Sequence, residues 1–452
     1  MRDAVADAAT IFRAGLARVD PVAMMRRVLS LSGDILRVHT ETECHEYDLS
    51  RFRHIFVLGA GKASARMALG LEAILGDRIT DGVVAVKEGY LERLAHIRLL
   101  EAAHPVPDER GAAAAREVLA LARRAGPDDL VLVLVSGGGS AILAAPLELP
   151  GRRLTLADKQ QTTRVLLGCG ATIQDINCVR KKLSAVKGGR LAAAIAPATC
   201  LGLLLSDVVG DDLDVIASGP TVPDPTTGAD ALAVLERYGV TDTIAPQALT
   251  VLRDVAAGLA PETPKPGDPA FDRTRTVLVG TNFQALLAAW HMAETLGYST
   301  LVLTSHLTGE AREMANLFLG MARDISENGV PLSRPACVIA GGETTVTLHG
   351  HGKGGRNQEM ALAFLAGLAR DAKNAETAVF LAASTDGSDG PTDATGAFAS
   401  LDILRRGQAL GLDPERYLAD NDAYHYFEAV ERLLITGPTN TNVCDIKVLI
   451  CP

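Results

Sequence analysis

The sequence predicts an α/β fold of two domains, each with a mainly parallel sheet covered by helices. Length is the first observation: at about 150 residues per domain, 452 residues give two or three domains. Uninterrupted apolar runs alternate with helical patterns, which is typical of a parallel sheet buried on both faces. A proline-rich segment precedes a restart of this alternation. We therefore expect an N-terminal Rossmann-like domain over residues 1–256, a linker over 257–273 and a C-terminal α/β domain over 274–452.

In the N-terminal half, hydrophobic periodicity predicts the elements in order. Apolar residues at helical spacing predict a helix from Ala4 to Val19, and Pro21 begins a second helix. Apolar runs predict strands at 54–58, 82–86, 99–102, 130–135 and 199–205. One helix is expected to end at Leu75, and four others are expected to span 108–125, 156–167, 171–183 and 189–194. The segment 218–227 is rich in proline and threonine and is predicted to be a loop.

The second half repeats the pattern. Strands are expected at 276–279, 300–304, 336–340, 378–383 and 443–449, with an exposed strand at 346–348. One helix is expected to end at Leu296, and two others are expected to span 310–326 and 358–370. Two tandem α/β domains account for this order of elements.

Composition excludes several classes of protein. The 48% hydrophobic and 22% charged content is globular, which excludes a disordered or fibrous chain. The net charge of −10 argues against a dedicated nucleic-acid binder. No signal peptide or apolar run of about 18 residues is evident, so we expect no membrane partner and a cytoplasmic location. The seven scattered cysteines indicate reduced thiols rather than a zinc site, and a homodimer is left open.

Two glycine-rich segments follow predicted strands, where open α/β sheets bind ligands. In the first, Gly59 and Gly61 would let backbone N–H groups approach an anion, and Lys62 would add a positive charge. The alternative is a tight turn with a solvated lysine. The second segment consists of Ser136, Gly137, Gly138, Gly139 and Ser140. Its backbone N–H groups could form a nest for phosphate oxygens. The alternative is that small residues are needed only because another loop packs closely against them.

Acidic residues follow two other strands. Asp207 and Asp386 come almost directly after predicted strands, and each is a candidate ligand of Mg²⁺ or a candidate base. The acids that follow Asp207, at 211, 212 and 214, are equally explained as a solvated capping turn. His104 could be a base, although a histidine before a proline turn is more often structural.

The segment 350–355 matches the GxGxxG pattern of dinucleotide-binding loops. The acid expected to bind the ribose, Asp386, comes later in the chain than usual, so this match is a weak signal. Arg356 just after it is more distinctive, because a cation at a helix N-terminus opposes the helix dipole. We interpret Arg356 as a group that binds an anion or developing charge; an exposed arginine is the alternative.

These motifs resemble one known family, the glycerate 2-kinases that contain a MOFRL domain, formerly labelled hydroxypyruvate reductases. The matching stretches run in order along nearly the whole chain: VLGAGKASARMA (57–68), HPVPDE (104–109), LVSGGGSAIL (134–143), INCVRKKLSAVKGGRLA (176–192), LSDVVGDDLDVIASGPTVPD (205–224), GGETTVTLHGHGKGGRNQEMALAF (341–364), STDGSDGPTDATGA (384–397) and LLITGPTNTNVCDI (433–446). The resemblance implies two α/β domains with the active site in the cleft between them, and a C-terminal MOFRL domain.

The resemblance also implies an activity, the phosphorylation of D-glycerate at its C2 hydroxyl by ATP with Mg²⁺. Lys62 and Arg356 match residues regarded as active-site residues in the family, and Asp207 and Asp386 are candidates for the metal or for the base. The glycine segments, with Gly341, Glu343, Asn357 and Glu359, are the expected residues for binding substrate or ATP. The alternatives are an NAD(P)H-dependent hydroxypyruvate reductase and a non-catalytic sensor of sugar acids.

Overall fold

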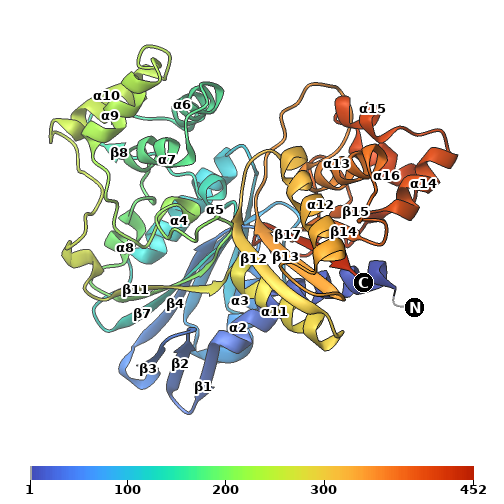
Figure 1. Cartoon of the computed structure of the whole chain (residues 1–452). Coiled ribbons are helices and arrows are strands. Elements are labelled where there is room, and N and C mark those ends of the chain that lie inside the picture. Colours follow the sequence, from blue (N-terminus) through green and yellow to red (C-terminus); the bar gives the residue numbers. More distant parts are fainter. Residues whose placement is uncertain (1–2) are drawn as a thin grey trace. The chain divides into compact units, whose positions relative to one another are not determined.

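The computed structural model describes residues 3–452, which divide into two compact units (Figure 1). The N-unit runs from Pro21 to Val279, and the C-unit joins the residues up to Asp20 to residues 280–452. The predicted two-domain α/β class is confirmed, and each unit has its own six-stranded sheet.

The units differ from the expected boundaries in two places. Helix α1 (Ala4–Arg18) belongs to the C-unit, where Gly15 lets it lie close to α11 (Asn282–Thr295): a Cβ at Gly15 would be 2.9 Å from the Ala285 carbonyl oxygen. The expected linker, residues 257–273, lies within the N-unit and hydrogen-bonds to it, with Cys200 N donating to Arg273 O at 2.9 Å. The strand that follows, β11 (Thr274–Gly280), joins the sheet of the N-unit.

The N-unit sheet has the strand order β11-β10-β7-β4-β5-β6. Five of these strands are mutually parallel, as predicted: β10 (Thr199–Leu205), β7 (Asp129–Val135), β4 (His54–Ala60), β5 (Asp81–Lys87) and β6 (Ile97–Ala102). Every residue of β7 is buried, which explains its uninterrupted apolar sequence.

Helices of the N-unit form two cores. Apolar side chains of α4 (Glu109–Ala122) and α8 (Arg190–Ile195) share one core with the parallel strands. Four other helices, whose apolar faces meet one another, form the second core; they are α6 (Leu156–Gly168), α7 (Ile173–Lys182), α9 (Gly228–Arg237) and α10 (Pro246–Ala256). Helix α3 (Ser64–Leu75) begins directly after the first glycine segment, and the four-residue α5 (Gly139–Ile142) begins within the second.

One part of the N-unit differs from the expected helix at Pro21. Helix α2 ends at Val28 (Pro21–Val28), and the chain then forms a three-stranded antiparallel sheet, visible with α2 in Figure 1. Its strands are β1 (Leu29–Ser32), β2 (Ile35–His39) and β3 (Cys44–Asp48), and a two-stranded ribbon, β8 (Glu148–Leu149) and β9 (Arg152–Arg153), lies further along the chain. These strands are short and carry mixed polar residues, so periodicity alone does not reveal them.

The C-unit sheet is mixed, so the prediction of a mainly parallel second sheet is wrong. Its order is β12-β13-β17-β14-β15-β16, and among these neighbouring pairs only β12 and β13 are parallel. The last strand, β17, lies between β13 and β14 and is antiparallel to both. A fully buried strand has the same apolar sequence in either direction, which is why the sequence did not show this. The strands are β12 (Ser299–Leu307), β13 (Ala336–Gly342), β14 (Val379–Ser384), β15 (Gly396–Ser400), β16 (Leu433–Leu434) and β17 (Asp445–Cys451).

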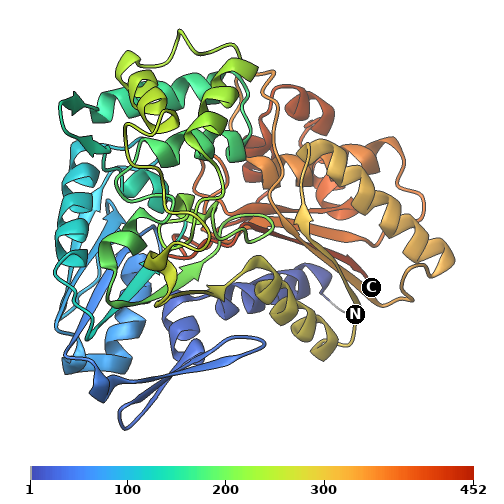
Figure 2. The same ribbon diagram turned by 90° about the vertical axis from the view of Figure 1, so that its left-hand side faces the viewer.

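Helices cover both faces of the C-unit sheet (Figure 2). Helices α1 and α11 pack on one face, and α12 (Ala311–Asn328) and α13 (Arg356–Arg370) pack on the other. Three short helices follow β15: α14 (Leu401–Ala409), α15 (Pro414–Ala419) and α16 (Ala423–Ala429). The predicted strand at 346–348 is absent, because Thr347 N donates to the Glu310 side chain at 2.8 Å instead of joining a sheet. Among residues 3–452, no helix combines the length and apolar character needed to cross a membrane.

Candidate active site

The topology of the N-unit sheet places the two glycine segments next to each other. After β4 the chain adds β5 and β6 on one side, and then β7 on the other side of β4. The carboxyl ends of β4 and β7 therefore flank the point where strand order reverses, which is where open α/β sheets bind ligands. Lys62 N donates to Gly137 O at 2.9 Å and Ala63 N to Ser136 Oγ at 3.0 Å, so hydrogen bonds join the two segments.

Three chemically active side chains meet at Gly137 and Gly138. A Cβ built at Gly137 would lie 2.3 Å from Asp207 Oδ2. One built at Gly138, where φ is +77°, would lie 2.8 Å from the His104 ring and 3.3 Å from Lys62 Cγ. Only glycine leaves room for this approach at both positions. The structure thus brings together Lys62, Asp207 and the glycines, and it adds His104 to them.

Other predicted residues of these segments have packing roles. A Cβ at Gly59 would be 2.3 Å from Leu134 O, and one at Gly139 would be 2.9 Å from Ala60 O. At Gly61, where φ is +145°, a Cβ would lie 2.1 Å from Ser136 Oγ. Ser136 is fully buried, and its hydroxyl accepts from Ala63 N and lies 3.0 Å from Ser64 Oγ. These contacts alone explain why small residues occupy these positions. That these residues bind substrate or ATP stays a prediction.

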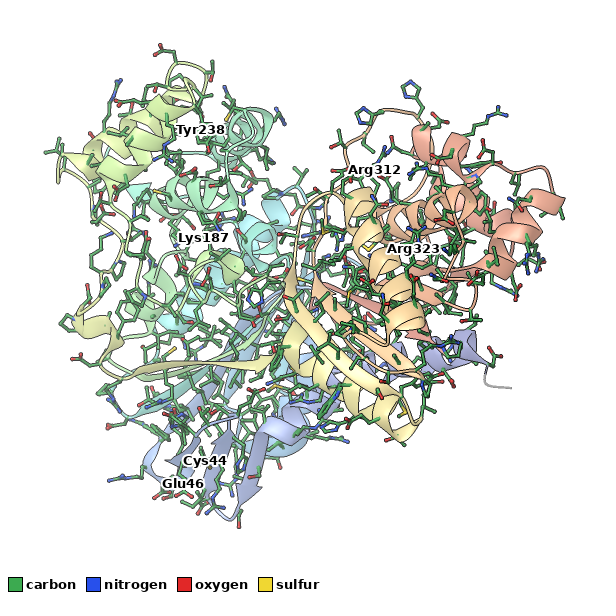
Figure 3. All side chains as sticks on the ribbon, in the orientation of Figure 1. Cys44, Glu46, Lys187, Tyr238, Arg312 and Arg323 are labelled. Atoms are coloured by element: carbon green, nitrogen blue, oxygen red, sulfur yellow. The ribbon has the colours of Figure 1, made fainter. Side chains whose placement is uncertain are left out.

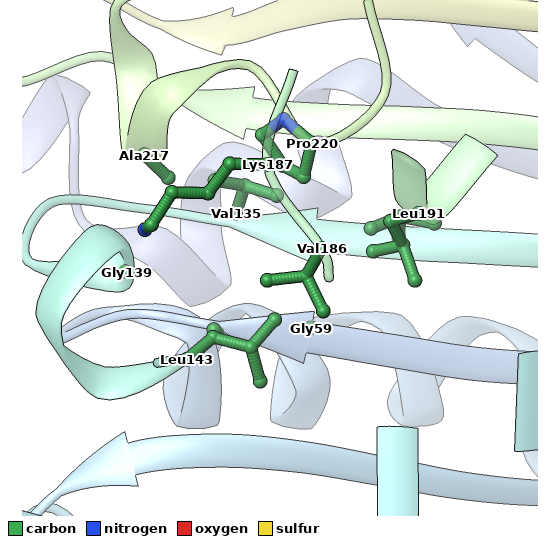
Figure 4. Close-up of a pocket in the computed structure, with 11 residues that line it drawn as sticks. Gly59, Val135, Gly139, Leu143, Val186, Lys187, Leu191, Ala217 and Pro220 are labelled. Atoms are coloured by element: carbon green, nitrogen blue, oxygen red, sulfur yellow. The ribbon is translucent and has the colours of Figure 1, made fainter. Parts of the chain in front are cut away.

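Ser140 differs, because its hydroxyl accepts a hydrogen bond from Lys187 Nζ at 2.7 Å. Figure 4 shows the Lys187 stem beside Ala217 and Val135, with its amino group toward the turn that begins at Gly139. The cavity in this view has a volume of about 10 Å³, which is no more than a single water requires. This cavity is therefore too small for a substrate.

In the C-unit, Arg356 is held by two acids. Its Nε and Nη2 donate to Asp445 Oδ2 and Oδ1 at 2.7 and 2.9 Å, and its Nη1 lies 2.7 Å from Glu343 Oε1. Asp445 is fully buried and also accepts from Lys447 Nζ at 3.1 Å. Burial alone would raise the pKa of Asp445, but Lys447 and Arg356 hold it below the usual range. A carboxylate between two cations therefore fixes Arg356 at the start of α13.

Sequence reasoning missed Asp445 and Lys447, although a signal existed. Both interrupt an apolar strand near the end of the chain, and a charge in such a strand requires a partner. The partner, Arg356, lies 89 residues away in sequence.

The N-terminus of α13 is capped by a residue that sequence reasoning did not select, Asp389. Its Oδ1 accepts from Asn357 N and Nδ2, both at 3.1 Å, and its Oδ2 accepts from Gln358 N at 2.8 Å. Burial raises the pKa of Asp389 to about 6. Asn357 is buried, and the contact observed for its side chain is this hydrogen bond to Asp389.

Glu359, also predicted to bind a ligand, lies inside a structural network. It is buried, forms an ion pair with Arg312 at 2.8 Å and accepts from Asn421 Nδ2 at 2.9 Å. Arg312 lies at the start of α12 (Figure 3). Gly341 is likewise packed, because a Cβ there would be 1.8 Å from Asn282 Oδ1.

The N–H groups of residues 350–353, the first four of the GxGxxG segment, already donate to acceptors within the protein. His349 N and Gly350 N both donate to Asn421 Oδ1, at 2.7 and 3.0 Å. His351 N and Lys353 N donate to the side chains of Asp420 and Asp422 at 3.0 and 2.9 Å. A phosphate would have to displace these acceptors, so the segment lacks the open nest of a dinucleotide-binding loop.

Asp386 follows β14 and takes part in a turn. Its Oδ1 accepts from Ser384 Oγ at 2.9 Å and from Ser388 N at 3.0 Å. Across the described part of the chain, no three or more His, Cys, Asp or Glu side chains cluster as a metal centre would. Mg²⁺ in a phosphate site needs only one or two protein carboxylates, so Asp207 beside the Gly137 backbone fits this lesser requirement.

Two family models, several relatives and solved structures are similar to this chain. Residues 7–253 match a family model described as a domain of unknown function, and residues 336–445 match the MOFRL family. A glycerate 2-kinase of Pyrococcus horikoshii is 40% identical over 88% of this chain and 87% of its own length. A candidate hydroxypyruvate reductase of Agrobacterium vitis is 43% identical, covering 87% and 86%. The crystal structure of a glycerate kinase from Thermotoga maritima matches with a TM-score of 0.85 and 36% identity, covering 99% of each chain.

Proposed function

Since this chain belongs to the family of glycerate 2-kinases that carry a MOFRL domain, we propose that it transfers the γ-phosphoryl group of ATP to the C2 hydroxyl of D-glycerate. The products are 2-phosphoglycerate and ADP. The observation that carries the proposal is the meeting of Lys62, His104 and Asp207 at the Gly137–Gly138 backbone. A cation, a carboxylate and bare glycine N–H groups at a sheet's switch point suit phosphoryl transfer, which depends on positioning and charge neutralisation.

In the N-unit, Lys62 neutralises charge on the transferring phosphoryl group or on the glycerate carboxylate. The backbone at Gly137 and Gly138 supplies N–H donors for phosphate oxygens. Asp207 either holds the metal or accepts the proton of the C2 hydroxyl. Replacing Asp207 would change how activity depends on metal concentration in the first case but not in the second.

In the C-unit, Arg356 supplies the second cation. Its guanidinium is fixed by Asp445 on one side and by Glu343 on another, so it meets a ligand in one orientation. Asp386 is the corresponding candidate in this unit for metal binding or proton transfer. Glu343, whose side chain is in direct contact with Arg356, helps to hold this guanidinium.

Magnesium is part of the proposal. When bound with ATP, Mg²⁺ neutralises charge on the phosphate oxygens. The Asp207 carboxylate is the N-unit group that would hold it, while Lys62 and the glycine N–H groups bind and orient the phosphates.

The test is a single reaction with ATP, Mg²⁺ and D-glycerate, in which ADP is measured and the product is identified as 2- or 3-phosphoglycerate. We expect 2-phosphoglycerate. A parallel reaction with NAD(P)H and hydroxypyruvate tests the reductase that one relative's name suggests. Oxidation of NAD(P)H without ADP formation from glycerate would overturn the proposal in favour of the reductase.

A further inference from the structure

A second cavity of the N-unit is lined by Gly138 and Ser140 of the second glycine segment. It has a volume of about 550 Å³, within the range of small-molecule sites. Its walls come from α6, from α7 and from the HPVP segment, and Gly138, His104 and Asp207 line it where it meets the candidate active site. The cavity thus continues the site rather than forming a separate hollow.

One wall of this cavity is apolar and open to solvent. Val106, Leu167 and Ile173 line it, with 59%, 59% and 47% of their surface exposed. They come from three different segments, and large apolar side chains that gather exposed around one hollow mark a binding surface. The wall therefore favours a ligand with an apolar part.

Three basic side chains line the inner end of the cavity. Lys187 and Lys159 are only 3% and 8% exposed, and Arg180 lies beside them on α7. Lys187 Nζ donates to Ser140 O and Oγ at 2.6 and 2.7 Å, and Lys159 Nζ donates to Ala145 O at 2.9 Å. Figure 3 marks the position of Lys187 within the N-unit.

Among residues 3–452, no acidic side chain forms an ion pair with Lys159, Arg180 or Lys187, and no acid contributes to their pKa shifts. Burial lowers the pKa of Lys159 to about 7, with Arg180 adding to the effect, and it lowers the pKa of Lys187 well below the ordinary value. A buried amine without a counter-ion is more easily kept neutral than charged, so an anionic ligand that supplied the counter-charge would be bound by the protonated amines. The other charged or titratable groups on the cavity are Arg164, His104 and Asp207.

We propose that this cavity binds the nucleotide, with the base and ribose on the apolar wall and the phosphate chain running past Lys159, Arg180 and Lys187 toward Gly138. The inference rests on the proposed function and names the unit that binds ATP. D-glycerate has no apolar group and is too small to fill about 550 Å³, so it does not account for the apolar wall. A nucleoside polyphosphate combines a flat base with several negative charges, which matches both ends of the cavity.

The first experiment measures binding of a fluorescent N-methylanthraniloyl ADP to the full chain without glycerate. Ile173→Glu places a negative charge on the apolar wall, and glutamate is well tolerated in the first turn of a helix. We expect about 10-fold weaker binding or more. Leu317→Glu is the matched control, because Leu317 is also an exposed helical residue (45%) but lies on α12. Equal weakening by both variants would refute the inference.

The second experiment uses Lys159→Met, which keeps the length of the buried stem and removes the charge. Because no acid in the described part of the chain pairs with Lys159, we expect the melting temperature to stay the same or rise while ADP affinity falls about 10-fold. A purely structural lysine would give the opposite result, with lower stability and unchanged affinity. If this variant does not fold, photolabelling of the unmodified chain with 8-azido-ATP decides, with label expected between residues 156 and 187.

The outcomes separate this inference from the proposed function. If the unmodified chain phosphorylates glycerate while both variants bind ADP normally, the cavity assignment is wrong and the proposed function stands. If the variants raise the KM for D-glycerate and leave ADP affinity unchanged, the cavity takes the acid substrate and the inference is refuted. If the unmodified chain neither binds ADP nor forms 2-phosphoglycerate, both fall.

Discussion

Replacing Arg356 by lysine is the sharpest test of the C-unit site. The change keeps the positive charge but cannot keep all three contacts, namely the two hydrogen bonds to Asp445 at 2.7 and 2.9 Å and the pair with Glu343 at 2.7 Å. A hydrogen bond to a charged group contributes about 1.5–3 kcal/mol. If the displaced lysine loses one such bond to the transferring phosphoryl group in the transition state, the rate falls about 10- to 150-fold, since each 1.36 kcal/mol is about tenfold.

We expect the loss in kcat rather than in the KM for glycerate. Arg356 is already paired with two acids before any ligand binds, and these acids offset much of its attraction for the carboxylate of bound glycerate. Its effect should therefore appear when charge develops on the transferring phosphoryl group. A coupled assay of ADP formation at varied D-glycerate separates the two parameters.

Arg370→Lys is the matched control for this experiment. Arg370 ends the same helix and pairs with Glu415, but both side chains are well exposed, so this pair contributes little. The melting temperature of each variant shows whether a rate change reflects unfolding. Unchanged kinetics in Arg356→Lys, or a change confined to KM, would refute the reasoning about the transition state.

Three further predictions follow. Lys62→Ala should lower kcat about 10²- to 10³-fold with an unchanged melting temperature, because one positioned charge is removed from a loop; a stable variant with near-normal turnover would remove Lys62 from the site. Asp207→Asn and Asp386→Asn should lower activity, and a true metal ligand should also raise the Mg²⁺ concentration needed for half-maximal rate; unchanged Mg²⁺ dependence in both would leave the metal bound by ATP alone. Burial raises the pKa of Asp389 from about 3.9 to about 6, so the folded state binds more protons between these values and loses stability as pH rises through them. Urea unfolding at pH 4–7 should give a flatter profile for Asp389→Asn, and an unaltered profile would contradict this assignment.

Local sequence determined the elements that carry the site. Glycines followed by Lys62, the run of three glycines at 137–139, and Arg356 at a helix start are all visible without a structure. They are visible because strand ends and helix starts are set by short-range backbone requirements, which a few neighbouring residues satisfy. The same reasoning predicted five parallel strands in the N-unit, since fully buried strands read as apolar runs.

Tertiary structure alone decided how those elements pair. Hydrophobic periodicity reports burial but not the neighbouring element, so neither the place of α1 on α11 nor the antiparallel insertion of β17 could be predicted. Partners distant in sequence decide what a polar group does: Asp445 fixes Arg356, and the side chains at 420–422 accept from N–H groups of the GxGxxG segment. The basic side chains at 159, 180 and 187, which form no ion pair with an acid among the described residues, also come together only through folding, because burial removes the water that would otherwise solvate them.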